Sequence, residues 1–100
     1  MNAKKEFLGH IGNRTVKCAE IVIHTGSYNK EPDIIAKLLP EYTQEDFKQF
    51  IEKLDIDYNK WYGSQELYGT IWYTDGAWST RGEYDGSEWW EYHKCPEIKF

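Results

Sequence analysis

The strongest constraint on the fold is a change in hydrophobic periodicity near Glu66. Beyond this residue the runs ELYGTIWY, WSTRGEY and EWWEYHK alternate between the two faces of an extended chain, and the segments TDGA and DGS separate them. A period of two is typical of half-buried strands, and Asp-Gly between two such runs is a strong hairpin signal. The sequence therefore predicts a three-stranded antiparallel meander in its C-terminal third.

The first Asp-Gly turn sets the expected register between the first two of these strands. A two-residue turn at 75–76 pairs Tyr73 with Trp78, and one face of the two strands then carries no charged side chain. Because burying a charge is costly, we expect the uncharged face to be the core face. The predicted core side chains of the meander are Leu67, Ile71, Tyr73, Trp78, Tyr84, Trp90 and Tyr92.

The second Asp-Gly turn allows two registers. A two-residue loop opposes Glu83 to Glu88 and sends Glu91 to the core face, which combines like-charge repulsion with a buried carboxylate. A three-residue loop that ends at Ser87 instead pairs Arg81 with Glu91 on the solvent side. We therefore expect the three-residue loop.

One segment before the meander has the pattern of an amphipathic helix, which we place at residues 44–54. Thr43 is a suitable N-cap, and Asp46 three residues later can complete a capping box and interact favourably with the helix dipole. Apolar side chains fall at i, i+3, i+4 and i+7, which is typical of a stripe that packs on a core. We expect this stripe to be buried against the meander: Phe47, Phe50, Ile51 and Leu54.

The N-terminal part is predicted to form a β-hairpin over residues 4–24. Gly12-Asn13 separates two strand-like runs and suits a type II′ turn. This register places four side chains on one face: Phe7, Ile11, Val16 and Cys18. The alternation then changes phase, so we expect either a bulge near residues 19–20 or burial of both faces of this strand. The segment IIAKLL at 34–39 lies between two prolines and is predicted to form a short helix.

These segments together predict an α+β fold. The chain has 100 residues, which is enough for one compact core and too few for two, so we expect a single domain that comprises residues 1–100. Its parts would be the N-terminal hairpin, the main helix and the C-terminal meander, with one layer of sheet packed against the helix.

The distribution of charge limits the possible partners. Residues 1–50 carry seven Lys/Arg and seven Asp/Glu, whereas residues 51–100 carry five and ten, so the whole net charge of −5 lies in the second half. Nucleic-acid binding usually needs a basic surface, so no direct contact with nucleic acid is expected. A basic protein partner, or mimicry of a nucleic acid by the acidic half, fits this charge better.

The sequence also suggests a cellular compartment. No run approaches the roughly 20 apolar residues of a membrane helix, and the N-terminal segment MNAKKEFLGHIGNR has no apolar stretch of the kind found in secretory signals. We therefore expect a cytoplasmic protein. Cys18 and Cys95 are too few for a disulfide framework, and in a reducing compartment both are expected to remain thiols.

Motifs of catalysis and cofactor binding are missing from the sequence. There is no Gly-x-Ser-x-Gly elbow, no glycine-rich phosphate loop and no Cys-x-x-Cys pair. The closest pairs with metal-ligand chemistry are Cys18 with His24 and His93 with Cys95, and their spacing is poor for zinc. We therefore expect a protein that is not an enzyme and that needs no metal and no cofactor.

The second half contains a dense signature of glycine, tryptophan and acidic residues. Its positions are Gly69-Thr70, Trp72, Asp75-Gly76, Trp78, the run from Arg81 to Trp90, and Cys95-Pro96. This signature resembles the C-terminal part of small proteins encoded by tailed bacteriophages and prophages, and the resemblance extends weakly over residues 38–58. It implies a protein acting in a bacterial cytoplasm, where small acidic phage proteins often bind and inhibit a host enzyme or defence complex. These families have no assigned activity, so the resemblance implies no site residue.

The aromatic residues supply the candidate functional site. Eleven of the 17 aromatic residues, including every tryptophan, lie between Tyr58 and Tyr92. In the expected register, three of them lie among charged side chains on the sheet face opposite the helix. Tryptophan, tyrosine and arginine dominate binding hot spots, so we predict that this face binds a partner. The predicted binding residues are Tyr68, Trp72, Arg81, Glu83, Trp89 and Glu91.

The function expected from these features is non-catalytic: the protein binds a host bacterial protein or defence complex and modulates or inhibits it. Three alternatives stay open. The same face could hold a small molecule or a sugar, in a binding module or a small enzyme. The acidic half could mimic a nucleic acid. The N-terminal hairpin or the loop at 58–65 could instead cover this face and make it a second small core.

Overall fold

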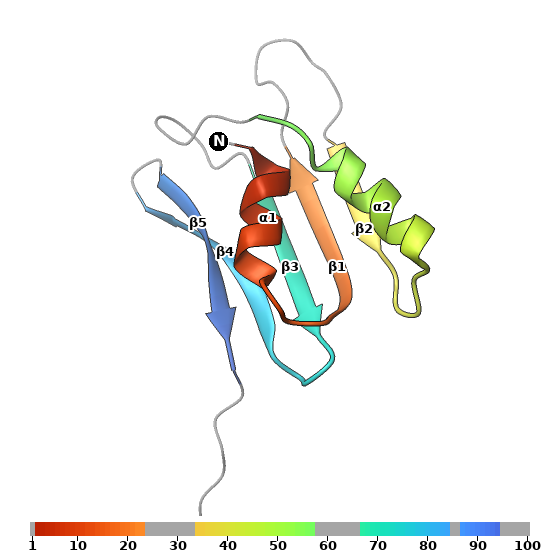
Figure 1. The fold of residues 1–100 in the computed structure, drawn as a ribbon. Helices are drawn as coiled ribbons and strands as arrows, with labels where there is room; N and C mark the ends of the chain where they lie inside the picture. Colours follow the sequence, from red (N-terminus) through yellow and green to blue (C-terminus); the bar gives the residue numbers. More distant parts are fainter. Residues whose placement is uncertain (1, 24–33, 58–66, 85–86, 95–100) are drawn as a thin grey trace, which may run out of the picture.

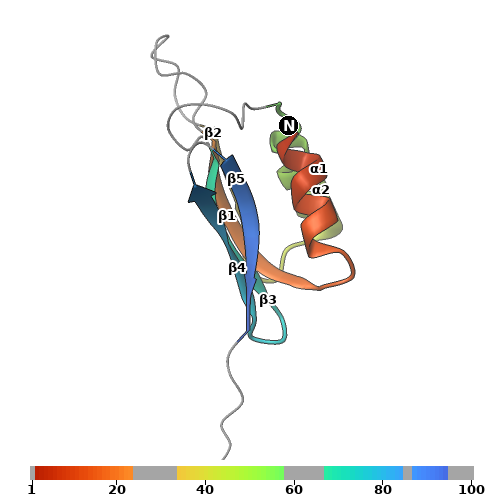
Figure 2. The ribbon, with the colours of Figure 1, turned by 90° about the vertical axis from the view of Figure 1, so that its left-hand side faces the viewer.

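The computed structural model describes residues 2–23, 34–57, 67–84 and 87–94 (Figure 1). Two helices and five strands follow one another: α1 (Ala3–Ile11), β1 (Val16–Ile23), β2 (Ile34–Leu38), α2 (Gln44–Lys53), β3 (Leu67–Tyr73), β4 (Trp78–Tyr84) and β5 (Ser87–His93). The strands form one antiparallel sheet in the order β2-β1-β3-β4-β5. Both helices lie against the same face of this sheet (Figure 2), so the predicted α+β class is confirmed.

The predicted meander is present as β3-β4-β5, but its first turn is one residue longer than expected. Trp72, and not Tyr73, pairs with Trp78, and the backbone N–H of Tyr73 donates to the carbonyl of Ala77 at 2.9 Å. The enclosed turn therefore holds three residues, and the last of them, Gly76, has a φ of +90°. A left-handed residue at the end of a three-residue hairpin loop is common, and glycine adopts this conformation readily.

This shift of one residue sends every side chain of β4 to the face opposite to the predicted one. Trp78 and Tyr84, which the sequence predicted in the core, lie on the face away from the helices. Arg81 and Glu83, which were predicted on the far face, lie on the helix side. The expected composition of both faces is therefore wrong for this strand.

The second turn is one residue shorter than expected. Arg81 pairs with Trp90 and Glu83 with Glu88, so the loop has two residues, and the predicted pairing of Arg81 with Glu91 is wrong. The repulsion that argued against this register is offset because Glu88 forms an ion pair with Arg81 at 3.2 Å. The errors in the two turns cancel on β5, whose Trp90 and Glu91 lie on the faces that the sequence predicted.

The N-terminal residues form the helix α1, so the predicted hairpin over 4–24 is wrong. Asn2 caps the helix, because its side-chain oxygen accepts the backbone N–H three residues later at 3.0 Å. The buried side chains recur every fourth residue: Ala3, Phe7 and Ile11. Gly12 follows with a φ of +52°, which glycine tolerates at the end of a helix. The Gly12-Asn13 pair therefore follows a helix and does not turn a hairpin.

Residues 34–38 form the strand β2, so the predicted short helix at 34–39 is wrong. β2 pairs with β1 along its whole length, and the inward-facing Leu38 is buried. Two adjacent isoleucines at its start favour an extended backbone. The irregularity of β1 lies between Val16 and Cys18, slightly before the position that the sequence predicted.

The helix α2 is confirmed together with its capping box. The Thr43 hydroxyl accepts the backbone N–H of Asp46 at 3.1 Å, and the Asp46 carboxylate accepts the backbone N–H of Thr43 at 3.0 Å. Phe50 is buried and meets Phe7 of α1 edge to face, with 5.3 Å between the ring centroids. The remaining stripe residues are buried or half-buried: Phe47, Ile51 and Leu54. Among the strands, β2 makes the most extensive contact with α2, whereas α1 contacts β5 of the meander. The stripe of α2 belongs to the same core cluster as Leu67 and Ile71 of β3.

Candidate functional site

The candidate site is the sheet face away from the helices, which we call the outer face. Neither helix covers it (Figure 2). Five aromatic side chains are exposed among the described residues, and four of them lie on this face: Tyr68, Trp72, Tyr84 and Trp89. Such a concentration on a face that neither helix covers is unusual for a protein that binds nothing.

The structure places four of the six predicted site residues on the outer face: Tyr68, Trp72, Trp89 and Glu91. Arg81 and Glu83 lie on the helix side, so they do not belong to this surface. The cause is the three-residue turn before β4. The same turn brings Trp78 and Tyr84 to the outer face, where the sequence prediction had not placed them. The signal was Gly76, which suits the left-handed end of a longer loop as well as a two-residue turn.

The outer face is organised as three rows that run across the strands. The middle row is polar and consists of Lys37, Glu20, Thr70, Thr80 and Glu91. One flanking row consists of Cys18, Trp72, Trp78 and His93. The other consists of Ile35, Val22 and Tyr68, with Gly82 and Trp89 at the β5 end. Rings and apolar side chains therefore border a polar strip.

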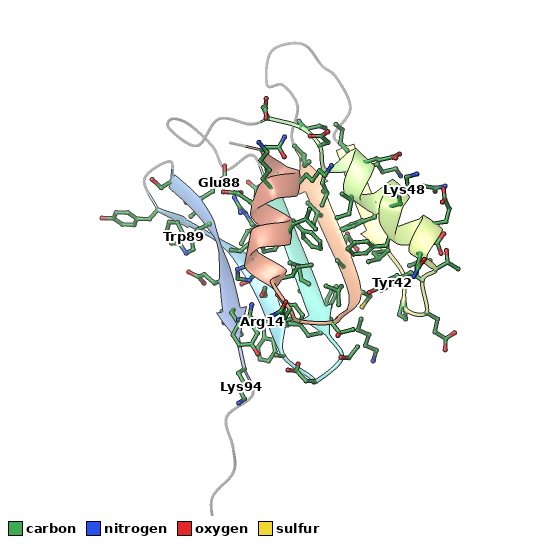
Figure 3. All side chains as sticks on the ribbon, in the orientation of Figure 1. Arg14, Tyr42, Lys48, Glu88, Trp89 and Lys94 are labelled. Atoms are coloured by element: carbon green, nitrogen blue, oxygen red, sulfur yellow. The ribbon has the colours of Figure 1, made fainter. Side chains whose placement is uncertain are left out.

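Trp89 of β5 (Figure 3) is held in a defined position on this face by a hydrogen bond to a neighbouring side chain. Its indole N–H donates to the Glu91 carboxylate at 2.9 Å. This hydrogen bond lies directly over Gly82, because a Cβ at that position would be 2.7 Å from the indole nitrogen and 2.6 Å from the carboxylate oxygen. Any larger residue at 82 would displace the indole. Glycine on β4 is therefore what allows Trp89 to lie against the sheet.

Trp78 is supported in a similar way by its cross-strand neighbour. The His93 ring stacks on the Trp78 ring with 5.6 Å between centroids, and the His93 Nε2 hydrogen-bonds with the Thr80 hydroxyl at 2.8 Å. Glu91 lies 3.9 Å from the same nitrogen. Two tryptophans of the outer face are thus fixed by contacts within the sheet itself.

A shallow groove of about 300 Å³ lies between two of the exposed rings. Tyr68 and Trp72 flank it, and each exposes about two-fifths of its surface. Thr70, half-buried, lies between them on β3, and the exposed Glu20 of β1 pairs with Thr70 across the strands. The groove therefore combines aromatic walls with a hydroxyl and a carboxylate.

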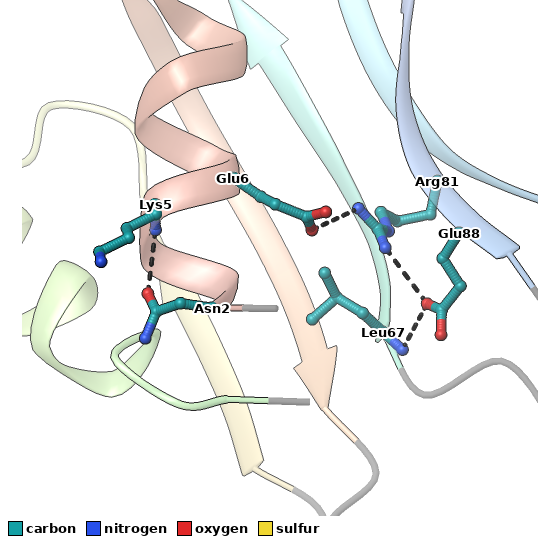
Figure 4. Close-up of polar contacts among 6 residues, drawn as sticks. All are labelled: Asn2, Lys5, Glu6, Leu67, Arg81 and Glu88. Atoms are coloured by element: carbon teal, nitrogen blue, oxygen red, sulfur yellow. Dashed lines mark hydrogen bonds and ion pairs between the residues drawn. The ribbon is translucent and has the colours of Figure 1, made fainter. Parts of the chain in front are cut away.

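On the helix side, Arg81 is the centre of a buried ion cluster (Figure 4). Its side chain is 1% exposed, and its guanidinium contacts Glu6 of α1 and Glu88 of β5, each at 3.2 Å. Glu88 also accepts the backbone N–H of Leu67 at 3.0 Å, and the guanidinium lies 5.2 Å from the ring of Trp90. The cluster joins α1 to three strands, so we interpret Arg81 as a structural residue.

A second buried polar group joins α1 to the sheet. The hydroxyl of Ser79 lies 2.7 Å from His10 Nε2 and 2.7 Å from the Tyr73 hydroxyl. Burial lowers the pKa of the His10 imidazole, and the nearby Arg14 and Arg81 lower it further. Burial likewise raises the pKa of Tyr73. Ser79 and His10 have the spacing of a nucleophile and a base, but Ser79 has no exposed surface, so a substrate cannot reach it.

Metal-ligating side chains are not grouped in the described part of the chain, where no set of three or more His, Cys, Asp or Glu could hold an ion. Cys18 is a free thiol on the outer face, and Cys95, the second predicted thiol, lies outside the described residues. Neither helix of the described segments has the length and apolarity needed to span a bilayer. Comparison with protein families, with curated proteins and with solved structures found no match for this chain.

Proposed function

We propose that this protein is a non-catalytic binding protein whose outer face binds another protein and thereby modulates or inhibits it. The observation that supports the proposal is the set of exposed aromatic side chains on a sheet face that neither helix covers. Exposed fractions of 40% for Tyr68, 43% for Trp72 and 38% for Trp89 leave large ring areas in contact with water. Tryptophan and tyrosine are the residues that most often dominate the energetics of protein interfaces.

The rigidity of these rings favours binding as well. A side chain that is already fixed before association loses little conformational entropy when a partner covers it. Trp89 is held by Glu91 over Gly82, and Trp78 is held by the stacked His93. The polar row between the rings can hydrogen-bond with a partner, which is the usual arrangement of an interface with aromatic anchors and polar groups beside them.

We further propose that the partner is a host bacterial protein or a defence complex. The support for this step is the resemblance of the C-terminal signature to small phage and prophage proteins, together with the net charge of −5. Negative charge on this protein accelerates encounter with a basic partner surface. The face itself has a mixed charge, with Glu20 and Glu91 against Lys37, and this gives the alternative of a nucleic-acid mimic little support.

The test uses the full chain as bait in a bacterial lysate, followed by mass spectrometry and by binding assays with the purified captured protein. We expect Trp89→Ala to weaken this binding by about 2 kcal/mol, roughly 30-fold, with little change in melting temperature. Leu8→Ala is the matched control, because Leu8 is also 38% exposed but lies on α1, away from the outer face.

Gly82→Ala adds a second measurement, because it disturbs the Trp89 indole without removing it. We expect this variant to remain folded and to bind less tightly than the wild type. If Trp89→Ala and Leu8→Ala bind the captured protein equally well, the outer face is not the binding surface and the proposal is wrong.

A further inference from the structure

The groove between Tyr68 and Trp72 has a chemistry that selects one kind of side chain. We propose that it takes an arginine of the bound protein, with the guanidinium against an aromatic ring and Glu20 as its counter-ion. This inference rests on the proposed function, because it names the group that the outer face recognises.

The size and shape of the groove suit a long, flat side chain. Tyr68 and Trp72 are four residues apart on one strand, so their Cα atoms are separated by about 13 Å, with Thr70 midway between them. This spacing leaves room for a whole side chain to lie on the strand between the rings. The volume of about 300 Å³ is at the lower limit for a ligand site, so the groove suits one residue better than a large molecule.

The charge at the groove favours a cation. Glu20 lies beside Thr70 and lines the groove, and no described cationic group is within ion-pair distance of its carboxylate. A cation held over an indole or phenol ring within about 6 Å is attracted by the ring quadrupole. The groove offers a ring face and a carboxylate to the same ligand.

Arginine fits these groups better than lysine does. Its guanidinium is planar, stacks on aromatic rings and can donate two hydrogen bonds to one carboxylate. A guanidinium is also less strongly hydrated than an ammonium group. Moving it from water into the groove therefore costs less desolvation free energy than moving a lysine ammonium there. Lys37 of β2 lies opposite Glu20 in the strand register, without an ion pair between the two, and is a described positive charge that opposes an incoming cation.

The test is a titration of the full chain with acetyl-Gly-Arg-Gly-amide, followed by ¹H–¹⁵N NMR. The matched neutral probe is the same peptide with citrulline, which keeps the shape and removes the charge. We expect the arginine peptide to shift the amides around Thr70 and Glu20, and the citrulline peptide to leave them unchanged. We expect Trp72→Ala to weaken arginine binding about fivefold.

Charge variants separate a specific site from general attraction to an acidic protein. Glu20→Gln should weaken the binding of the arginine peptide about threefold, whereas Glu52→Gln on α2 removes the same charge elsewhere and should leave the binding constant nearly unchanged. Lys37→Met should strengthen binding about twofold, and Lys48→Met on α2 should not. If Glu20→Gln and Glu52→Gln have equal effects, or if citrulline binds as well as arginine, the proposal is overturned.

Binding assays with the captured host protein distinguish a failure of the arginine site from a failure of the proposed function. If the arginine peptide does not bind at the groove but Trp89→Ala still abolishes binding of the captured protein, the arginine site is wrong and the proposed function stands. If Trp89→Ala has no effect on the captured protein, the proposed function fails whatever the peptide does.

Discussion

The buried ion cluster around Arg81 gives the most quantitative prediction, for the substitution Arg81→Met. Methionine keeps an unbranched chain that can still pack against Trp90, so the main change is the loss of the positive charge. The side chain of Glu88 is 1% exposed and cannot turn to water, whereas that of Glu6 is 12% exposed and lies on α1 near solvent. The cost therefore comes mainly from Glu88.

Removing one partner of a buried ion pair typically costs about 3–5 kcal/mol, because the other charge is left in a poorly solvated site. A small domain has a total stability of about 5–15 kcal/mol, so Arg81→Met should lower the urea midpoint greatly. Adding Glu88→Gln removes the carboxylate charge that Arg81 no longer neutralises and keeps an oxygen that can accept the N–H of Leu67. We therefore expect the double variant to be more stable than Arg81→Met by about 2 kcal/mol.

Urea denaturation at about pH 7.5 measures both free energies, and an unchanged dependence on urea concentration would show that the folded state is still compact. Lys48→Met on α2 is the control for losing a positive charge from an exposed position and should change stability by less than about 0.5 kcal/mol. A double variant no more stable than Arg81→Met would refute the reasoning, because the loss would then come from packing and not from the buried charge of Glu88.

Two further predictions concern the junctions between the helices and the sheet. Phe50→Ala should lower the free energy of unfolding by about 3–5 kcal/mol, because Phe50 is 2% exposed and its ring packs on Phe7. A melting temperature of the variant within a few degrees of the wild type would contradict this packing. Because the pKa of His10 is lowered below 6.5 in the folded protein, the unfolded chain binds a proton there more readily than the folded chain does. The free energy of unfolding should therefore fall as the pH drops below 6.5 and should stop falling from this cause below the pKa of the folded state. His10→Gln should remove this component, so equal pH dependence of the unfolding free energy in both proteins would exclude His10 as its source.

The parts of the fold that the sequence predicted are those with a local cause. The capping box at Thr43 and the apolar stripe of α2 lie within one segment, so the sequence determines that helix without reference to the rest of the chain. The alternation in β3, β4 and β5 and the two Asp-Gly turns likewise predict a meander from residues close in sequence. The partner of α2 could not be predicted in this way, because β2 was itself assigned to a helix.

The errors arose where two local patterns are equally compatible with the residues. Phe7 and Ile11 are four residues apart, which places them on one face of a helix and also on one face of a strand. The glycine at 76 fits a two-residue turn and also the end of a three-residue turn. That single choice decided whether Arg81 belonged to the site, since a slip of one residue reverses the faces of a strand. Arg81 and Glu88 form an ion pair only when both turns have their observed lengths, so neither turn considered alone predicts this contact.

The position of β1 in the sheet has a consequence for how the chain reaches its folded state. β1 lies between β2 and β3, and its Ile23 pairs with Leu67, which is 44 residues further along the chain. The strands of the meander are joined by turns of two or three residues, so their ordering requires little loss of loop entropy. Contacts between distant segments are the slow ones. We therefore expect the meander to form early and the docking of β1 along β3 to be the event that limits the folding rate.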